Sequence, residues 1–591
     1  MKTIHVTRKL LSKYKTIEEA LLDANDGDTI KIDPGTYQES VTIAKSVHLV
    51  GLGEPETVII QAPMEIINKA SVSIKNISFA ECEKGLTVKN GYAQLTHCQF
   101  TRLKKWGIHV LEDGHLDLTD ATIRHSGIGL FVVGRARAEY CALYSQRGSQ
   151  VCVSGNGRFV MKHSHIYQGK SAAIYFDQNS RSFVENCQIY GHHSENMQLK
   201  SMGNSEVALK DCLIYEGSSG GALVLGESKL TLNSCTLTNN VPKQVVVLGG
   251  ETIIQNSLFE AGQIGVDIND NGTAQLEATI LTSHEDDHIR VGDGALYVYR
   301  STIKFGQKSG VVLTKNAYAH VESSDLFGHM MPQLAVSEQA RISLKHSAIF
   351  YGKHYGFWLT EQASADVGHC RFYENELNQL VIADKSEADL EDIQVFDGAQ
   401  SGLYIHDHSH ANVVNSTFYH HNDLYPQIYV SSHSTITMKE SKLYDSYESG
   451  IRFDMEASGL LEHCQFSGHY EAQIDIQHSA PTIRECVIEN GGTCAIRLLH
   501  AGGFIENCTF TGHEHNIAIG GECDTDIIGQ EADALRQYAE ALSVTEEMEA
   551  QLSQAEMRAA LEKAQKDAER EERTVEIVGL VEELEEQLGK K

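Results

Sequence analysis

Charged residues recur at a regular interval in the C-terminal third of the chain. Arg452, Asp475 and Arg497 are separated by 23 and 22 residues, and Asp454 lies two positions after Arg452. Arginine side chains bind carboxylates in a bidentate manner, and an aspartate or a histidine can move a proton in the transition state. Placed side by side, these residues could bind an acidic sugar and act on it.

Aromatic and imidazole side chains precede this group by one or two of the same intervals, at Tyr404, His406 and Tyr429. Tyrosines can face a pyranose ring, and a histidine can transfer protons near neutral pH. The predicted catalytic residues are therefore Arg452, Asp454, Asp475, Arg497 and His406. An ordinary ladder of opposite charges on adjacent strands has the same spacing and stabilises strand stacking by about a few tenths of a kcal/mol per pair. The sequence leaves both interpretations open.

Short strands repeated along the chain must position these residues. The residue before each strand recurs as Gln150, Ala173, Asn196, Gly221, Gln244, Gly265, His288, Gly310, Gln333, Gly356, Gln379, Gly402, Gln427, Gly450, Gln473, Ala495 and Asn516. From 150 to 516 this gives sixteen intervals over 366 residues, a mean period just under 23. The strands alternate apolar and exposed positions, as in "GIRFDM" and "QIDIQH". A sustained period of this size predicts a solenoid of all-β coils.

This column alternates a large amide with Gly or Ala, His288 being the one substitute, so the repeating unit is a pair of coils. A stacked amide can donate to and accept from neighbouring coils, while Gly supplies positive φ or leaves room for the neighbour's side chain. We interpret the column as structural.

A second column, about fourteen residues later, holds nine of the thirteen cysteines and exchanges Cys with Ser and Ala. The cysteines are Cys98, Cys141, Cys187, Cys212, Cys235, Cys370, Cys464, Cys486 and Cys508. A disulfide framework would not tolerate such exchange, whereas a tight inward corner accepts any small, weakly polar side chain. We predict a buried ladder of reduced thiols.

The repeats "SGVVLTKNAYAHVESSDLF" (309–327) and "HYGFWLTEQASADVGHCRF" (354–372) resemble the parallel β-helix repeats of the pectin-lyase-like superfamily. The segment 14–60, with the capping-box pair Thr16 and Glu19 and the "DPGTY" turn, looks like the N-terminal cap of that superfamily. The expected fold is an all-β, right-handed parallel β-helix solenoid of about 20 coils. Its expected parts are an N-terminal cap (1–60), the β-helix (61–530) and an acidic α-helical tail (531–591).

The resemblance implies a fold more than an activity, because the superfamily contains pectate and pectin lyases, esterases, hydrolases, epimerases, tailspikes and repeat proteins without sugar chemistry. Only Asp454 and Asp475 fall in the charged group, which is few for the calcium site of pectate lyases. The Asp-Pro-His-Asp motif of mannuronan epimerases is absent. In "HDHSH" (406–410) a strand-to-turn segment splays the histidines, and an Asn/Asp/Gly turn explains "DINDNG" (267–272). We predict no metal and no cofactor.

The net charge of −31 opposes binding to phosphate backbones or anionic lipid, so we expect no nucleic-acid or membrane partner. The N-terminus has no apolar core with a small-residue cleavage site, which favours a cytoplasmic location. Residues 531–578 lack Gly and Pro and form a charged helical pattern that can fold back, pair with another helix or join a partner. The ending "GLVEELEEQLGKK" looks like the helix that leads into some AAA-type ATPase domains, so an AAA-type partner is a further expectation.

These observations favour a non-enzymatic function, an intracellular scaffold or recognition rod whose outer faces bind a protein or an acidic glycan. The alternative is a carbohydrate-active enzyme of the lyase or uronate-epimerase type that acts on an acidic polysaccharide. The missing secretion pattern weighs against the enzyme, since such substrates usually lie outside the cell.

Overall fold

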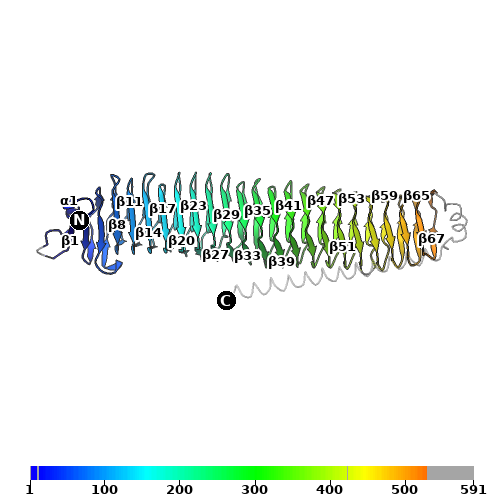
Figure 1. The fold of residues 1–591 in the computed structure, drawn as a ribbon, viewed down its shortest axis with the longest axis horizontal. Helices are drawn as coiled ribbons and strands as arrows, with labels where there is room; N and C mark the ends of the chain where they lie inside the picture. The colour runs from blue at the N-terminus through cyan, green and yellow to red at the C-terminus, as the bar shows by residue number, and fades with distance from the viewer. Residues whose placement is uncertain (1, 10–11, 422–423, 529–591) are drawn as a thin grey trace, which may run out of the picture.

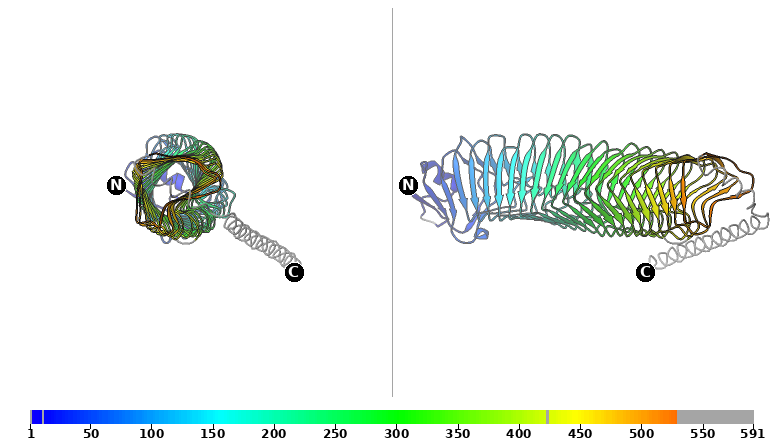
Figure 2. Two further views of the ribbon diagram at one scale, coloured as in Figure 1. Left: turned by 90° about the vertical axis from the view of Figure 1, so that its right-hand side faces the viewer. Right: turned by 45° about the vertical axis from the view of Figure 1, so that its right-hand side comes forward.

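The computed structural model describes residues 2–9, 12–421 and 424–528, which form a long rod of stacked β-coils (Figure 1). One parallel sheet of 24 strands (sheet A) runs from β1 (Thr3–Val6) to β68 (Asp524–Ile528), and two further sheets (sheets B and C) have 22 strands each. The end-on view in Figure 2 superposes the coils around one axis. The predicted parallel β-solenoid is confirmed.

The rod has about 23 coils, so the prediction of about 20 was too low. The difference arises at the N-terminal end, in the segment that we assigned to a separate cap. There β2 (Thr29–Ile32) pairs with β5 (His48–Gly51), and β3 (Gly35–Tyr37) pairs with β6 (Val58–Ile60), in the same parallel register as the later coils. These strands already belong to sheets A and B.

The predicted N-terminal helix is present as α1 (Ile17–Asp23). Thr16 accepts a hydrogen bond from the Glu19 backbone, and the Glu19 carboxylate accepts one from the Thr16 backbone, which completes the capping box. Ile17, Ala20 and Leu21 are buried. That α1 protects this end of the rod stays a prediction, and the predicted tail (531–591) lies outside the described residues. No helix in the described ranges has the length and apolar character that a membrane span requires.

Each coil contributes one strand to every sheet, as in the coil of β58 (Ile451–Phe453, sheet C), β59 (Ser458–Glu462, sheet A) and β60 (Gln465–Ser467, sheet B). Between sheets A and B the chain turns through one residue in the left-handed conformation, here His463 with φ 53°. Asn, Asp and His tolerate this conformation better than most residues, which explains why they recur at this corner.

The cysteine column follows this corner directly, and its side chains face inward. Eight of its nine cysteines are buried, Cys508 is half-buried, and all thirteen cysteines of the chain are free thiols. The predicted burial of this column is confirmed, and the reduced state of its thiols stays a prediction. The thiols also satisfy backbone groups, since Cys98 Sγ lies 3.5 Å from the Thr96 carbonyl oxygen, an acceptor at the turn.

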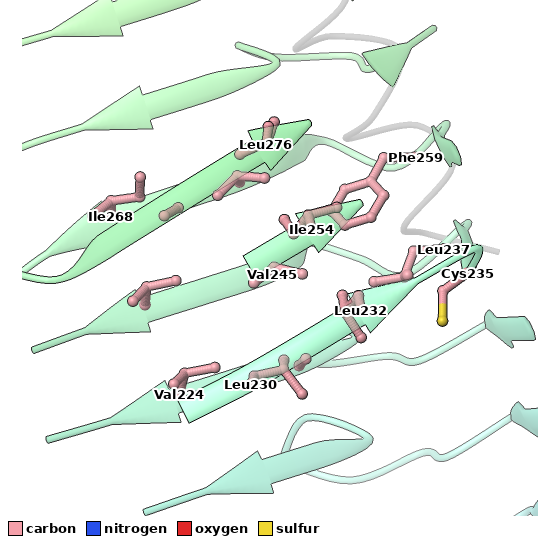
Figure 3. Close-up of a cluster of buried hydrophobic side chains, with 14 of the residues drawn as sticks. Val224, Leu230, Leu232, Cys235, Leu237, Val245, Ile254, Phe259, Ile268 and Leu276 are labelled. Atoms are coloured by element: carbon pink, nitrogen blue, oxygen red, sulfur yellow. The ribbon is translucent and has the colours of Figure 1, made fainter. Parts of the chain in front are cut away.

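Apolar side chains fill the rod along its whole length. Figure 3 shows Val224, Leu232 and Ile254 among the labelled side chains that point into the space between the sheets and stack on equivalent residues of neighbouring coils. No coil can bury these side chains alone, so each depends on the coils above and below it.

Polar side chains form a second buried line at the corner before sheet C. The amide column is fully buried at Gln150, Gln198, Gln244, Gln333, Gln379, Gln427 and Gln473, and His288 is buried with it. The predicted Asn196 was wrong: Gln198 precedes β25 (Leu199–Ser201), because the loop before this strand is two residues longer than the period implies.

A further buried polar residue lies four to six positions earlier on the same coils. These residues are Gln146, His192, Asn240, His284, His329, Asn375, His421 and His469. Within a coil, Asn375 Nδ2 donates to Gln379 Oε1 at 2.6 Å. Across two coils, Gln198 Nε2 donates to Asn240 Oδ1 at 2.7 Å. We call the two columns together the buried polar ladder.

Glycine on the intervening coils leaves the space that this ladder occupies. A Cβ atom on Gly306 would lie 2.4 Å from His288 Cε1 and 2.9 Å from His329 Cδ2. The predicted two-coil unit therefore has a steric cause, since each pair of large polar residues needs a small residue on the coils beside it.

Substituting Gly306 tests this explanation. Gly306→Ala is expected to reduce the free energy of unfolding by about 1–3 kcal/mol, because the packed imidazoles cannot move away from the new methyl group. Urea denaturation measures the change. The matched control is Gly502→Ala, whose Cβ would meet its nearest atom at 3.5 Å. An equal decrease in the free energy of unfolding for both variants would show that steric exclusion does not cause the alternation of large polar residues with glycine.

Candidate functional site

The predicted charged residues lie on three neighbouring strands of sheet C. Arg452 on β58 pairs in register with Asp475 on β61 (Ala472–Gln477), which pairs with Arg497 on β64 (Cys494–Leu499). The residues on either side, such as Ile451 and Phe453, point into the core and are buried. Because side chains alternate along a strand, Arg452 must point outward, and the predicted stack of Arg, Asp and Arg is confirmed.

Asp475 lies at the centre of this group and has no exposed surface. Arg497 Nε donates to Asp475 Oδ1 at 3.0 Å, and Arg497 Nη2 donates to Oδ2 at 2.7 Å. Arg452 Nε and Gln477 Nε2 also donate to Oδ2, at 2.7 and 2.9 Å. Four donors surround the two oxygens, so this carboxylate is covered and its hydrogen-bonding capacity is used within the protein.

Two glutamates that the sequence did not reveal complete the group. Glu448 accepts a hydrogen bond from Arg452 Nη2, and Glu471 Oε2 lies 3.4 Å from Arg497 Nη1. Glu448 comes from the loop before β58 and Glu471 from the loop before β61, outside the strand positions that the repeat marks. Two arginines now face three carboxylates. We call these five residues the Asp475 ion network.

The network displaces the pKa values of its carboxyl groups in opposite directions. Burial opposes ionisation of Asp475, but the hydrogen bonds and charges of Arg497 and Arg452 outweigh it and lower the pKa of this carboxyl. Burial raises the pKa of Glu448, and the charge of Arg452 offsets only part of this effect. At neutral pH Asp475 is an anion held between two cations.

The other predicted residues form a separate aromatic group beside the network. Tyr404 stacks on Tyr429 at 5.0 Å and on His406 at 4.4 Å between ring centroids. The Tyr429 hydroxyl donates to Asp454 Oδ2 at 3.3 Å, and His406 Nδ1 lies 2.7 Å from Asp407 Oδ2. Within the described residues, no hydrogen bond or ion pair joins His406 or Asp454 to the Asp475 ion network. The structure therefore divides the predicted site in two.

Repeat models of one family match most of the rod. The model of the right-handed β-helix region matches residues 106–259, 245–395 and 378–531, which together span more than half of the 591 residues. The chain belongs to the right-handed β-helix family. The resemblance to parallel β-helix repeats is thus confirmed. No curated protein sequence matches this β-helix protein.

Several solved β-helix structures are similar to it at low identity. The PL6 family alginate lyase AlyGC is 11% identical, with 88% of this chain and 100% of that chain covered and a TM-score of 0.33. The catalytic domain of a GH87 α-1,3-glucanase is 9% identical, with 51% and 64% covered and a TM-score of 0.31, so the match spans less than two thirds of that domain. The A-module of the Azotobacter vinelandii mannuronan C-5 epimerase AlgE6 is 10% identical, with 79% and 93% covered and a TM-score of 0.22. Similarities of this size carry no information about activity.

The three histidines of the segment 406–410 each contact a different residue. His408 stacks on His433 at 4.9 Å between ring centroids, and His410 Nδ1 lies 2.7 Å from Thr435 Oγ1, while His406 contacts Asp407. The splaying predicted for these side chains is confirmed. In the described part of the chain, no group of three histidine, cysteine or acidic side chains is placed to hold a metal ion.

The chemistry open to the candidate site follows from these contacts. A general base needs a lone pair that can reach a substrate proton, and the Asp475 oxygens are buried beneath two arginines. Burial and the nearby Asp454 carboxylate raise the pKa of Tyr429, so this phenol stays protonated at neutral pH and acts as a hydrogen-bond donor. The arrangement suits ligand contact at its edges better than proton transfer at its centre.

Proposed function

We propose that this β-helix is a non-catalytic recognition rod that binds an extended partner, a glycan or a protein, along its outer faces. The state of Asp475 is the observation that carries the proposal. This carboxylate is fully buried and accepts four hydrogen bonds from Arg452, Arg497 and Gln477. Such a group supports the stacking of coils and is closed to a substrate.

A line of aromatic rings on the outer face of sheet B supplies a binding surface. One ring from each of six successive coils stacks on the next, with centroid distances of 4.8 to 5.1 Å. The rings belong to Phe327, Phe350, Tyr373, Phe396, Tyr419 and Tyr444, which we call the aromatic ladder. All six are half-buried. Their faces are occupied by each other, so they present ring edges and phenol hydroxyls to a partner.

The enzymatic alternative remains a second candidate because of one observation. Carboxyl groups with pKa values displaced in opposite directions are the pattern of an acid and base pair, and Glu448 and Asp475 show it. In that case Arg452, Asp454, Asp475, Arg497 and His406, with Glu448 added, would act on an acidic polysaccharide as a lyase or an epimerase. Glu448→Gln would then abolish turnover of the polymer.

Binding to a panel of immobilised neutral and acidic polysaccharides tests the proposed surface. Tyr373→Ser together with Tyr419→Ser is expected to weaken binding by about tenfold, because each substitution removes a ring edge and a hydroxyl. Tyr447→Ser together with Tyr470→Ser is the matched control, since both tyrosines are exposed and lie outside the aromatic ladder. Equal weakening in both pairs would refute the ladder as the binding surface.

A further inference from the structure

A pocket of about 520 Å³ opens on the corner after sheet B, near the N-terminal third of the rod. Its lining includes four cationic side chains and one histidine, Arg102, Lys104, Arg147, Lys170 and His125, and no acidic residue. We call it the basic corner pocket. Its composition contrasts with the net charge of −31 on the whole chain.

The pocket lies where successive coils place equivalent corner residues side by side. Backbone hydrogen bonds between coils place Lys104, Gly127, Arg147 and Lys170 at the same position of four successive coils. Two residues before this column, the left-handed corner residues are Arg102, His125, Ser145 and Gln168. Ser145 and Gln168 line the hollow together with the long cationic side chains.

The charges around the hollow are only partly neutralised by the protein. Arg102 forms an ion pair with Glu81 at 2.9 Å, and Arg147 Nη2 donates to the backbone carbonyls of Leu103 and Lys104 at 3.3 and 3.1 Å. Lys104 and Lys170 form no ion pair within the described residues, and Glu83, on which the charge of Lys104 also acts, pairs with Lys105 at 2.8 Å. The four cationic side chains around the pocket repel each other, and a bound anion would reduce that repulsion.

The spread of the charges indicates a polymer. Coils repeat at about 4.8 Å, so Lys104 on the first and Lys170 on the fourth of these coils are about 14 Å apart along the rod, which exceeds a single small anion and suits a chain with repeated charges. Tyr144 and Tyr167, each one residue before a pocket residue, begin a line of stacked tyrosines that continues through Tyr190 and Tyr215 with centroid distances of 4.7 to 5.1 Å. Stacked phenols beside the cations suit a hydroxyl-rich ligand.

We infer that the basic corner pocket binds the anionic groups of an acidic saccharide chain, and that the neighbouring tyrosines contact its sugar rings. The inference rests on the proposed function, because it names the class of glycan that the rod binds. The shared chemistry is a saccharide with repeated negative charges, which carboxylate or sulfate groups can supply. The site lies outside sheet C and involves no residue of the Asp475 ion network.

Binding of the full chain to polygalacturonate, dextran sulfate and neutral dextran tests the inference. One or both charged polymers are expected to bind and neutral dextran to bind at least tenfold more weakly, with affinity that falls as salt rises. Lys104→Ser with Lys170→Ser is expected to raise the dissociation constant by about tenfold. The charge-matched control is Lys315→Ser with Lys385→Ser, two exposed lysines remote from the pocket and from the aromatic ladder, which is expected to change it less than twofold. Comparing the two charged polymers identifies the anionic group.

The outcomes separate this inference from the proposed function. Equal binding by the pocket and control variants, or no binding of the unchanged protein to either charged polymer, would overturn the pocket. If saccharide binding then depends on Tyr373 and Tyr419 alone, the proposed recognition function is retained and the inference about the pocket is rejected. Chemical change of the polymer during the assay would instead overturn the non-catalytic function, whatever the pocket variants do.

Discussion

The rod is expected to lose most of its stability as the pH falls from about 6.5 to about 4. Burial lowers the pKa of six histidines of the buried polar ladder, His192, His284, His288, His329, His421 and His469. For His329 the pKa falls to about 4, from an ordinary value of 6.5. In this window the unfolded chain binds protons that the folded chain does not. The free energy of unfolding therefore decreases as the pH is lowered. For His329 this difference in pKa corresponds to about 3 kcal/mol of stability.

Exchange of residues within the ladder isolates the histidine effect. His329→Asn reproduces the Asn375 and Gln379 pair of a later coil, in which Asn375 Nδ2 donates to Gln379 Oε1. The variant is expected to change stability at pH 7 by less than about 1 kcal/mol and to be more stable than the unchanged protein at pH 4.5 by about 2 kcal/mol. Urea unfolding at the two pH values measures both quantities.

The reverse exchange is the matched control. Asn375→His adds a buried imidazole at an equivalent position and is expected to steepen the loss of stability below pH 6.5. If His329→Asn and Asn375→His show the same pH dependence as the unchanged protein, the buried histidines do not cause the acid sensitivity.

Removal of the Asp475 charge is expected to destabilise the C-terminal coils strongly. Asp475→Asn leaves Arg452 and Arg497 without their common partner, and breaking a buried ion pair in this way costs about 3–5 kcal/mol. Asp454→Asn is the control, because Asp454 lies outside the Asp475 ion network; its side-chain contacts within the described residues are the long 3.3 Å hydrogen bond from Tyr429 and the exposed His478 at 3.9 Å. Its expected cost is less than about 1 kcal/mol. Urea unfolding at pH 7 measures both.

Replacement of the whole network distinguishes lost pairing from lost packing. Arg452→Met, Asp475→Leu and Arg497→Met replace the central charges with apolar side chains of similar size, and Glu448→Gln with Glu471→Gln removes the two charges that would otherwise lose their arginine partners. The combined variant is expected to recover most of the stability that Asp475→Asn loses, because no unpaired buried charge remains. Stability within 1 kcal/mol of the unchanged protein in Asp475→Asn alone would show that the network is not structural, and its role in chemistry would need to be reconsidered.

The sequence was sufficient to predict the rod because each coil repeats the same physical requirements. Small residues at the cysteine corner and the alternation of amides with glycine are constraints on every coil or every second coil, so they appear as a period. Asn196 was mistaken for Gln198 where a longer loop shifts the period. The predicted number of coils was too low because the strands within residues 29–60 do not show the repeat pattern of the later coils.

The charged site was predictable only at the level of strand register. Alternation along β58, β61 and β64 placed Arg452, Asp475 and Arg497 on one face, as the structure shows. Glu448 and Glu471 were not predicted because they lie in loops. The repeat pattern predicts the orientation of strand side chains but not of loop side chains. The basic corner pocket escaped notice for a related reason: its residues come from a corner between strands, outside the two columns that the repeat marks.

Proton NMR of an acidic polysaccharide during incubation with the protein tests the central claim most directly, because cleavage, elimination and epimerisation each change the spectrum of the sugar. The same sample gives the bound fraction of the polymer. A non-catalytic recognition rod predicts binding with an unchanged spectrum. New sugar signals that disappear with Glu448→Gln would contradict it.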